Sequence, residues 1–125
     1  MKQFTYDLTA GRIGLWLTIT QRDSVGREIR IYSINLSKRG FSVILQMPMV
    51  SASETSLCDF DSFLYPDRIE EEEILVQQMM SGRTDDLDKR VINLCSMLCA
   101  LWCGGNTEET LHNTVYQSVE AWADL

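Results

Sequence analysis

The stretch Ile13–Thr20, with the sequence IGLWLTIT, decides the fold class because its aliphatic residues recur at every second position. This spacing places four side chains on one face of a pleated strand: Ile13, Leu15, Leu17 and Ile19. The same alternation occurs around residues 4–8, 29–36 and 41–47, and Pro48 ends the last run. Short polar connections separate these runs, so we predict a four-stranded antiparallel meander over residues 3–47.

Two features interrupt this regular pattern. Within the third run, Ile29 and Ile31 have one parity whereas Ile34 and Leu36 have the other, so we expect a β-bulge near Tyr32-Ser33. Residues 49–66 then mix Ser, Thr and Asp with large apolar side chains and show no alternation. We predict that they form a crossing loop, pinned to the core by its aromatic residues.

The remaining residues, 67–123, show the periodicity of helices. Apolar residues spaced by three and four predict a first helix over 69–80, with Glu70–Glu73 in its first turns. We expect Thr84 to cap a second helix, and Asn106, with an acidic residue three positions later, to start a third. The sequence therefore predicts one α+β domain over residues 1–125, with three helices packed against the sheet.

Length and composition exclude several classes of protein. The chain has 125 residues, of which 45% are hydrophobic, which is typical of one folded domain rather than a disordered chain. Its longest nearly apolar run, Val91–Cys103, has 13 residues, fewer than the roughly 20 that span a bilayer. We expect a cytoplasmic protein without membrane contact, since the first residues also lack a secretory signal. The all-round apolar character of Val91–Cys103 predicts a homodimer contact through that helix.

Charge is distributed unevenly along the chain. The formal net charge is −7, but residues 1–50 carry +4, from seven basic and three acidic residues. Residues 51–125 carry −11, from four basic and fifteen acidic residues. Such a split makes the molecule an electrical dipole unless the two halves fold against each other, and it points to a charged binding surface.

The acidic residues cluster at two predicted helix starts. The cluster consists of Glu70, Glu71, Glu72, Glu73, Asp85 and Asp86. The simplest interpretation is that carboxylates favour the positive end of a helix and are solvated there. The sharper hypothesis is a non-catalytic protein-binding module that presents these carboxylates to a basic patch of a larger protein, in some cases as a mimic of nucleic-acid phosphates. Phage-encoded inhibitors of host enzymes or defences, and adaptors, are of this size and charge.

A second function class uses the sheet instead. Trp16, Arg30 and Tyr32 predict an aromatic and cationic surface that could bind a small ligand or a nucleotide. Trp16 could equally be covered if the sheet is packed on both faces. Direct binding of nucleic acid is disfavoured, because the net charge opposes it and no aromatic RNA-binding signature is present.

Nothing in the sequence selects a catalytic residue, a cofactor or a metal site. His112 is the only histidine, so neither a catalytic triad nor a histidine metal site can be assembled around it. The ladder Cys95, Cys99 and Cys103 has the spacing of one helix face, but zinc ligands usually come from two short turns, and packing residues are the simpler interpretation. The pair Asp59 and Asp61 is not distinguished from any other acidic segment.

Overall fold

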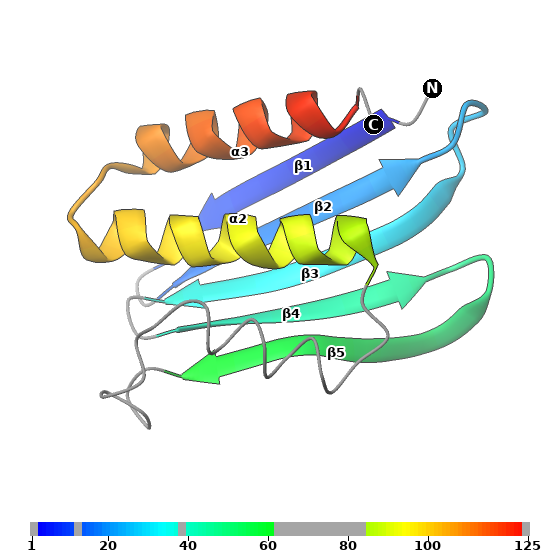
Figure 1. The fold of residues 1–125 in the computed structure, drawn as a ribbon, viewed down its shortest axis with the longest axis horizontal. Helices are drawn as coiled ribbons and strands as arrows, with labels where there is room; N and C mark the ends of the chain where they lie inside the picture. Colours follow the sequence, from blue (N-terminus) through cyan, green and yellow to red (C-terminus); the bar gives the residue numbers. More distant parts are fainter. Residues whose placement is uncertain (1–2, 12–13, 38–39, 62–84, 124–125) are drawn as a thin grey trace.

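The computed structural model describes residues 3–11, 14–37, 40–61 and 85–123 of the chain. They form a five-stranded antiparallel sheet in which neighbouring strands follow one another in the chain (Figure 1). The strands are β1 (Gln3–Ala10), β2 (Leu15–Arg22), β3 (Glu28–Ser37), β4 (Gly40–Met47) and β5 (Ser51–Asp61), and the helices are α2 (Asp86–Cys103) and α3 (Glu108–Trp122). The predicted α+β class and the meander over residues 3–47 are confirmed.

The fifth strand corrects the prediction of a crossing loop over residues 49–66. The chain reverses after β4 in a tight turn, where the Val50 amide donates a 3.1 Å hydrogen bond to the Met47 carbonyl. β5 then pairs with β4, but its register shifts twice, between Val43 and Ile44 and between Gln46 and Met47. The first shift leaves Leu57 as an extra residue and changes which residues face the core, and the second inserts two more residues into β5, so β5 has no period-two pattern that a sequence reading could detect.

The β-bulge lies at Ile29, so the prediction of a bulge near Tyr32-Ser33 was wrong. In the pairing of β2 with β3, Gln21 lies opposite Arg30 and Arg22 lies opposite Glu28, which leaves Ile29 as the extra residue. Beyond the bulge the register is continuous, so one set of alternate β3 residues faces the helices: Arg30, Tyr32, Ile34 and Leu36. The sequence placed Ile29 and Ile31 on that side, but both are only half-buried.

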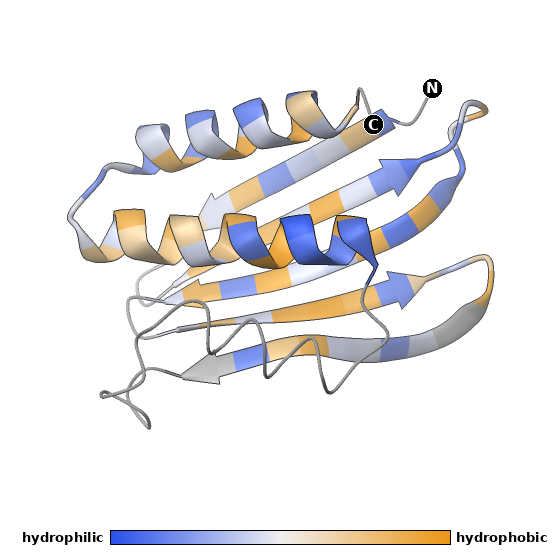
Figure 2. Cartoon of the chain, viewed as in Figure 1, coloured by the Kyte–Doolittle hydropathy of each residue, from blue (hydrophilic) through white to orange (hydrophobic). Residues whose placement is uncertain are grey.

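Both described helices lie on one face of the sheet (Figure 1). α3 packs along β1, and α2 packs across β3 and β4. The core between the layers is made of aliphatic and aromatic side chains from every described strand and both helices. Figure 2 shows that α2 is hydrophilic over its first turns and apolar toward its end, so its start is the part of the layer where polar contacts concentrate.

The start of α2 differs by one residue from the prediction. Asp85 is the N-cap, and its side chain accepts a 2.9 Å hydrogen bond from the Asp88 amide. Asp88 reciprocates, since its carboxylate accepts a 3.2 Å hydrogen bond from the Asp85 amide, which completes a capping box. Thr84, the predicted cap, and the predicted helix over 69–80 lie outside the described residues.

The start of α3 also corrects the prediction. Thr107 is the N-cap, with its side chain accepting a 3.3 Å hydrogen bond from the Thr110 amide. Asn106, the predicted first residue, instead donates a 2.8 Å hydrogen bond from its side chain to the Leu101 carbonyl and closes the end of α2. Neither α2 nor α3, the two helices among the described residues, is long and apolar enough to cross a membrane.

Candidate functional site

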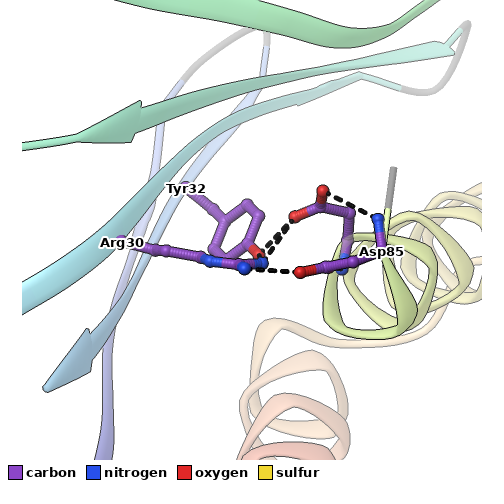
Figure 3. Close-up of polar contacts among 4 residues, drawn as sticks. Arg30, Tyr32 and Asp85 are labelled. Atoms are coloured by element: carbon purple, nitrogen blue, oxygen red, sulfur yellow. Dashed lines mark hydrogen bonds and ion pairs between the residues drawn. The ribbon is translucent and has the colours of Figure 1, made fainter. Parts of the chain in front are cut away.

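The most buried polar contacts of the described residues join β3 to the start of α2 (Figure 3). Tyr32 donates a 2.6 Å hydrogen bond to Oδ1 of Asp88, which is 2% exposed. Arg30 donates hydrogen bonds from Nη1 to the same carboxylate oxygen and to the Tyr32 hydroxyl, each 3.2 Å long, and its Nη2 pairs with Asp85. We call these four residues, Arg30, Tyr32, Asp85 and Asp88, the Arg30 cluster.

Electrostatics keep the Arg30 cluster in one protonation state at neutral pH. The hydrogen bond to Asp85 raises the pKa of Arg30, and the same contact lowers the pKa of the Asp85 carboxyl. Burial, followed by the hydrogen bond to Asp88, raises the pKa of Tyr32. The charged Arg30 pairs with the ionised Asp85, and the neutral Tyr32 phenol donates to Asp88, so the cluster links β3 to the start of α2.

Gln21 lies beside the Arg30 cluster and was missed by the sequence analysis. Its backbone pairs with Arg30 across the β2–β3 ladder, and its side chain is 4% exposed. Oε1 of Gln21 and Nε of Arg30 are buried and have no hydrogen-bond partner among the described residues. The parity of β2 was the available signal, because Gln21 continues the alternation of Leu17 and Ile19 toward the helices.

The predicted acidic cluster is only partly visible. Glu70, Glu71, Glu72 and Glu73 lie outside the described residues. Asp85 belongs to the Arg30 cluster, where its charge is offset by Arg30, whereas Asp86 is exposed. The basic and acidic halves of the chain therefore fold against each other at Arg30, and this contact reduces the dipole expected from the sequence.

The predicted ligand surface is divided between the two faces of the sheet. Arg30 and Tyr32 face the helices, whereas Trp16 is 45% exposed on the opposite face, where its strand partner is Asn35. The Trp16 ring lies over Gly11, and a Cβ atom added to Gly11 would be 2.3 Å from the ring. The structure therefore does not bring Trp16 together with Arg30 and Tyr32.

The cysteines differ in exposure along the predicted ladder. Cys95 is buried, Cys99 is half-buried and Cys103 is exposed, while Cys58 on β5 is buried close enough to Cys95 to influence it. Burial raises the pKa of Cys58 to about 12 and that of Cys95 well above its usual value, so both are thiols at neutral pH. In the part of the chain that the structure describes, no three metal-ligating side chains are grouped to hold an ion.

The apolar segment Val91–Cys103 of α2 is buried mainly by contacts within the same molecule. Its inward residues pack against the sheet and α3: Val91, Ile92, Leu94, Cys95 and Leu98. On the outer side, Met97 is exposed. The apolar run that predicted a homodimer is thus largely explained by intramolecular packing, and the homodimer stays a prediction.

His112 belongs to a surface that the sequence analysis did not assemble. It is half-buried on α3, with Nε2 3.6 Å from Glu108, and its ring contacts that of Tyr6 on β1, at 6.2 Å between centroids. One turn further along α3, Tyr116 is 54% exposed and close to Tyr6. A hydrogen bond to Glu120, a turn beyond, raises the pKa of Tyr116. Two aromatic rings, His112 and Tyr116, therefore lie between Glu108 and Glu120 along the side of α3 that adjoins β1.

The described residues of β1 and α3 share one sign of formal charge. β1 and α3 together contain no Lys or Arg, and their acidic residues are Asp7, Glu108, Glu109 and Glu120. We call these two elements the β1–α3 edge. The described arginines of the basic half, by contrast, are all in ion pairs: Arg22 with Glu28, Arg27 with Asp23, and Arg30 with Asp85 and Asp88.

Comparison with protein-family models, with curated proteins and with solved structures found no match to this chain.

Proposed function

We propose that this protein is a non-catalytic protein-binding module, an inhibitor or adaptor, that presents an acidic surface to a basic patch of a larger protein. The single observation that supports this most is the β1–α3 edge, which carries four carboxylates and no basic residue. The described arginines of the basic half, Arg22, Arg27 and Arg30, are held in ion pairs elsewhere. Asp86 and Glu70–Glu73 remain candidates for an acidic binding surface, and the cytoplasmic setting remains part of the proposal.

The state of the titratable groups supports a binding role over a catalytic one. In the Arg30 cluster the Tyr32 phenol and the Arg30 guanidinium both donate to the buried Asp88 carboxylate, and the buried thiols Cys58 and Cys95 are protonated. A nucleophile or a general base needs an available lone pair beside a substrate, which none of these groups offers.

Charge reversal tests the proposal. The variant Glu109→Lys/Glu120→Lys alters the β1–α3 edge, and Glu54→Lys/Asp59→Lys is a matched control on exposed positions of β5. Each tagged variant is used to capture partners from the native host at low salt. We expect the edge variant to lose the protein that the wild type captures and the control to retain it, with both melting temperatures nearly unchanged. Equal capture by both variants would contradict the proposal.

The predicted Glu70–Glu73 surface is tested in the same assay. The variant Glu70→Lys/Glu72→Lys adds the same charge change at the sequence-predicted cluster. Loss of capture in this variant alone would move the binding surface away from the β1–α3 edge while leaving an acidic-surface function in place.

Trp16 favours a second candidate function, the binding of a small ligand with a flat or apolar face. Its indole is exposed and is positioned by the close approach of Gly11. Titration of tryptophan fluorescence with a nucleotide panel tests this candidate. A response that Trp16→Ala abolishes supports it, and no response across the panel argues against it.

A further inference from the structure

β1 is an open and regular sheet edge. It pairs with β2 through all eight of its residues without a register shift, and its other side has no strand partner among the described residues. An edge strand points alternate backbone N–H and C=O groups outward, ready to pair with another strand. β1 has no Pro, no Lys and no β-bulge, which are common protections of an edge strand, and its one charged residue is Asp7. The opposite edge, β5, is interrupted by its two register shifts.

α3 packs along this edge of the sheet. The rings of Phe4 and Trp122 meet edge to face with centroids 5.8 Å apart, and the Tyr6 hydroxyl lies 3.5 Å from the His112 carbonyl oxygen. Figure 1 shows α3 running along the outer side of β1. Phe4 and Tyr6 are only half-buried, and Tyr116 is exposed. A strand added to β1 would therefore cover three aromatic side chains on its helix side.

A second copy of this chain does not fit this edge. Paired strands lie about 4.8 Å apart. Because α3 packs on β1 itself, two copies joined through β1 would bring their α3 helices to a similar separation. Packed helices need about 8–10 Å between their axes, so the two would collide. The edge accepts a bare extended segment that carries no helix of its own.

Charge selects the composition of that segment. Asp7 points to the helix-free face of β1, and Glu109 and Glu120 are exposed on α3. With no basic residue on either element, an acidic peptide would be repelled and a basic one attracted.

We propose that an extended peptide segment of a partner protein, with Lys or Arg alternating with apolar residues, binds as a sixth strand along β1. Backbone hydrogen bonds to β1 provide affinity, and the apolar side chains cover Phe4, Tyr6 and Tyr116 on the helix side. The basic side chains then lie on the opposite face beside Asp7, and the carboxylates of α3 attract them through their longer-range field. This inference rests on the proposed acidic-surface function and specifies its site and its mode of binding.

The test uses the full chain and a capped ten-residue peptide of alternating Val and Lys as the probe. Two further peptides carry N-methyl groups on the odd or on the even backbone nitrogens, which removes one set of donors at constant charge. We expect one methylated peptide to bind at least about tenfold more weakly than the parent and the other to bind nearly as well, because a strand offers only alternate donors to one neighbour. Alternate β1 amides should become protected from hydrogen exchange when the parent peptide binds.

The outcomes separate this inference from the proposed function. No binding of the Val/Lys peptide, or equal binding of all three peptides, overturns strand addition. If the three peptides bind equally but the Glu109→Lys/Glu120→Lys variant binds all of them more weakly, acidic-surface binding stands without strand pairing. If one methylated peptide fails but charge reversal and added salt change nothing, strand addition stands and the acidic-surface function falls. Hydrogen exchange in β4 reports whether each variant remains folded.

Discussion

Tyr32 and Asp88 are joined by a buried 2.6 Å hydrogen bond although 56 positions separate them in the sequence. The Asp88 carboxylate also accepts a hydrogen bond from Arg30. Its second oxygen accepts a hydrogen bond from the Asp85 amide in the capping box of α2. One buried carboxylate therefore both fixes the first turn of α2 and ties that turn to β3. The contact between the basic and acidic halves of the chain depends on this residue.

The substitution Tyr32→Phe tests how much this contact stabilises the fold. It removes the hydroxyl donor and leaves the buried Asp88 oxygen with Arg30 alone, so we expect a loss of about 1–3 kcal/mol in the free energy of unfolding. Urea denaturation followed by circular dichroism measures the loss. Tyr116→Phe, on an exposed phenol, is the control and should stay within about 0.5 kcal/mol of the wild type. Equal effects of the two substitutions would refute a stabilising role for the buried hydrogen bond.

Asp85 makes stability depend on pH. Arg30 lowers the pKa of Asp85 in the folded protein below its usual value of 3.8, so its contribution is present above that pH and is lost as the pH falls further. Asp85→Asn removes this charge but keeps a good N-cap. We expect the variant to be less stable than the wild type at pH 5–7 and the difference to shrink below about pH 4.

Thermal unfolding at a series of pH values measures this difference. Asp86→Asn is the control, because Asp86 is exposed and has no ion pair with the described residues. A difference for Asp85→Asn that stays constant down to pH 2.5 would show that its ion pair with Arg30 does not contribute to stability.

The strands were predictable where buried apolar residues recur at every second position. β2 and β4 have that pattern without interruption on the core side, and the predicted strand runs match them. β5 was not predictable, because its register shifts separate Leu57 and Cys58 from any alternation although both are buried. A bulge belongs to the pairing of two strands, and one strand's sequence does not specify it.

The polar contacts were less predictable, because the bulge at Ile29 decides which residues of β3 face the helices. No local pattern places Arg30 and Tyr32 on the core side of β3 while Ile29 and Ile31 are available for it. The acid that receives them, Asp88, is buried because α2 brings it over β3, a packing relationship that no local pattern encodes. Only the capping preference of Asp85 and Asp88 was a local signal, and it marked a helix start rather than a contact.

The cysteines should differ in reactivity with a thiol reagent. Cys103 is exposed, whereas burial raises the pKa of Cys58 to about 12 and keeps the Cys95 thiol protonated. At pH 8 we expect rapid modification of Cys103 in the folded protein and modification of Cys58 and Cys95 only after unfolding in urea. Peptide mapping by mass spectrometry identifies the modified sites. Rapid labelling of Cys95 in the native protein would mean that α2 opens readily from the sheet.

Gln21 offers the opposite kind of substitution, one that should stabilise the protein. Its buried Oε1 has no hydrogen-bond partner, and an unsatisfied buried acceptor costs about 1–3 kcal/mol. Gln21→Met keeps the length of the side chain and removes the amide, so we expect the free energy of unfolding to rise by about 1 kcal/mol. Gln117→Met, on an exposed position of α3, is the matched control and should change stability by less than about 0.5 kcal/mol. Destabilisation by Gln21→Met would mean that the amide contributes a hydrogen bond to the fold, with Nε of Arg30 as the adjacent donor.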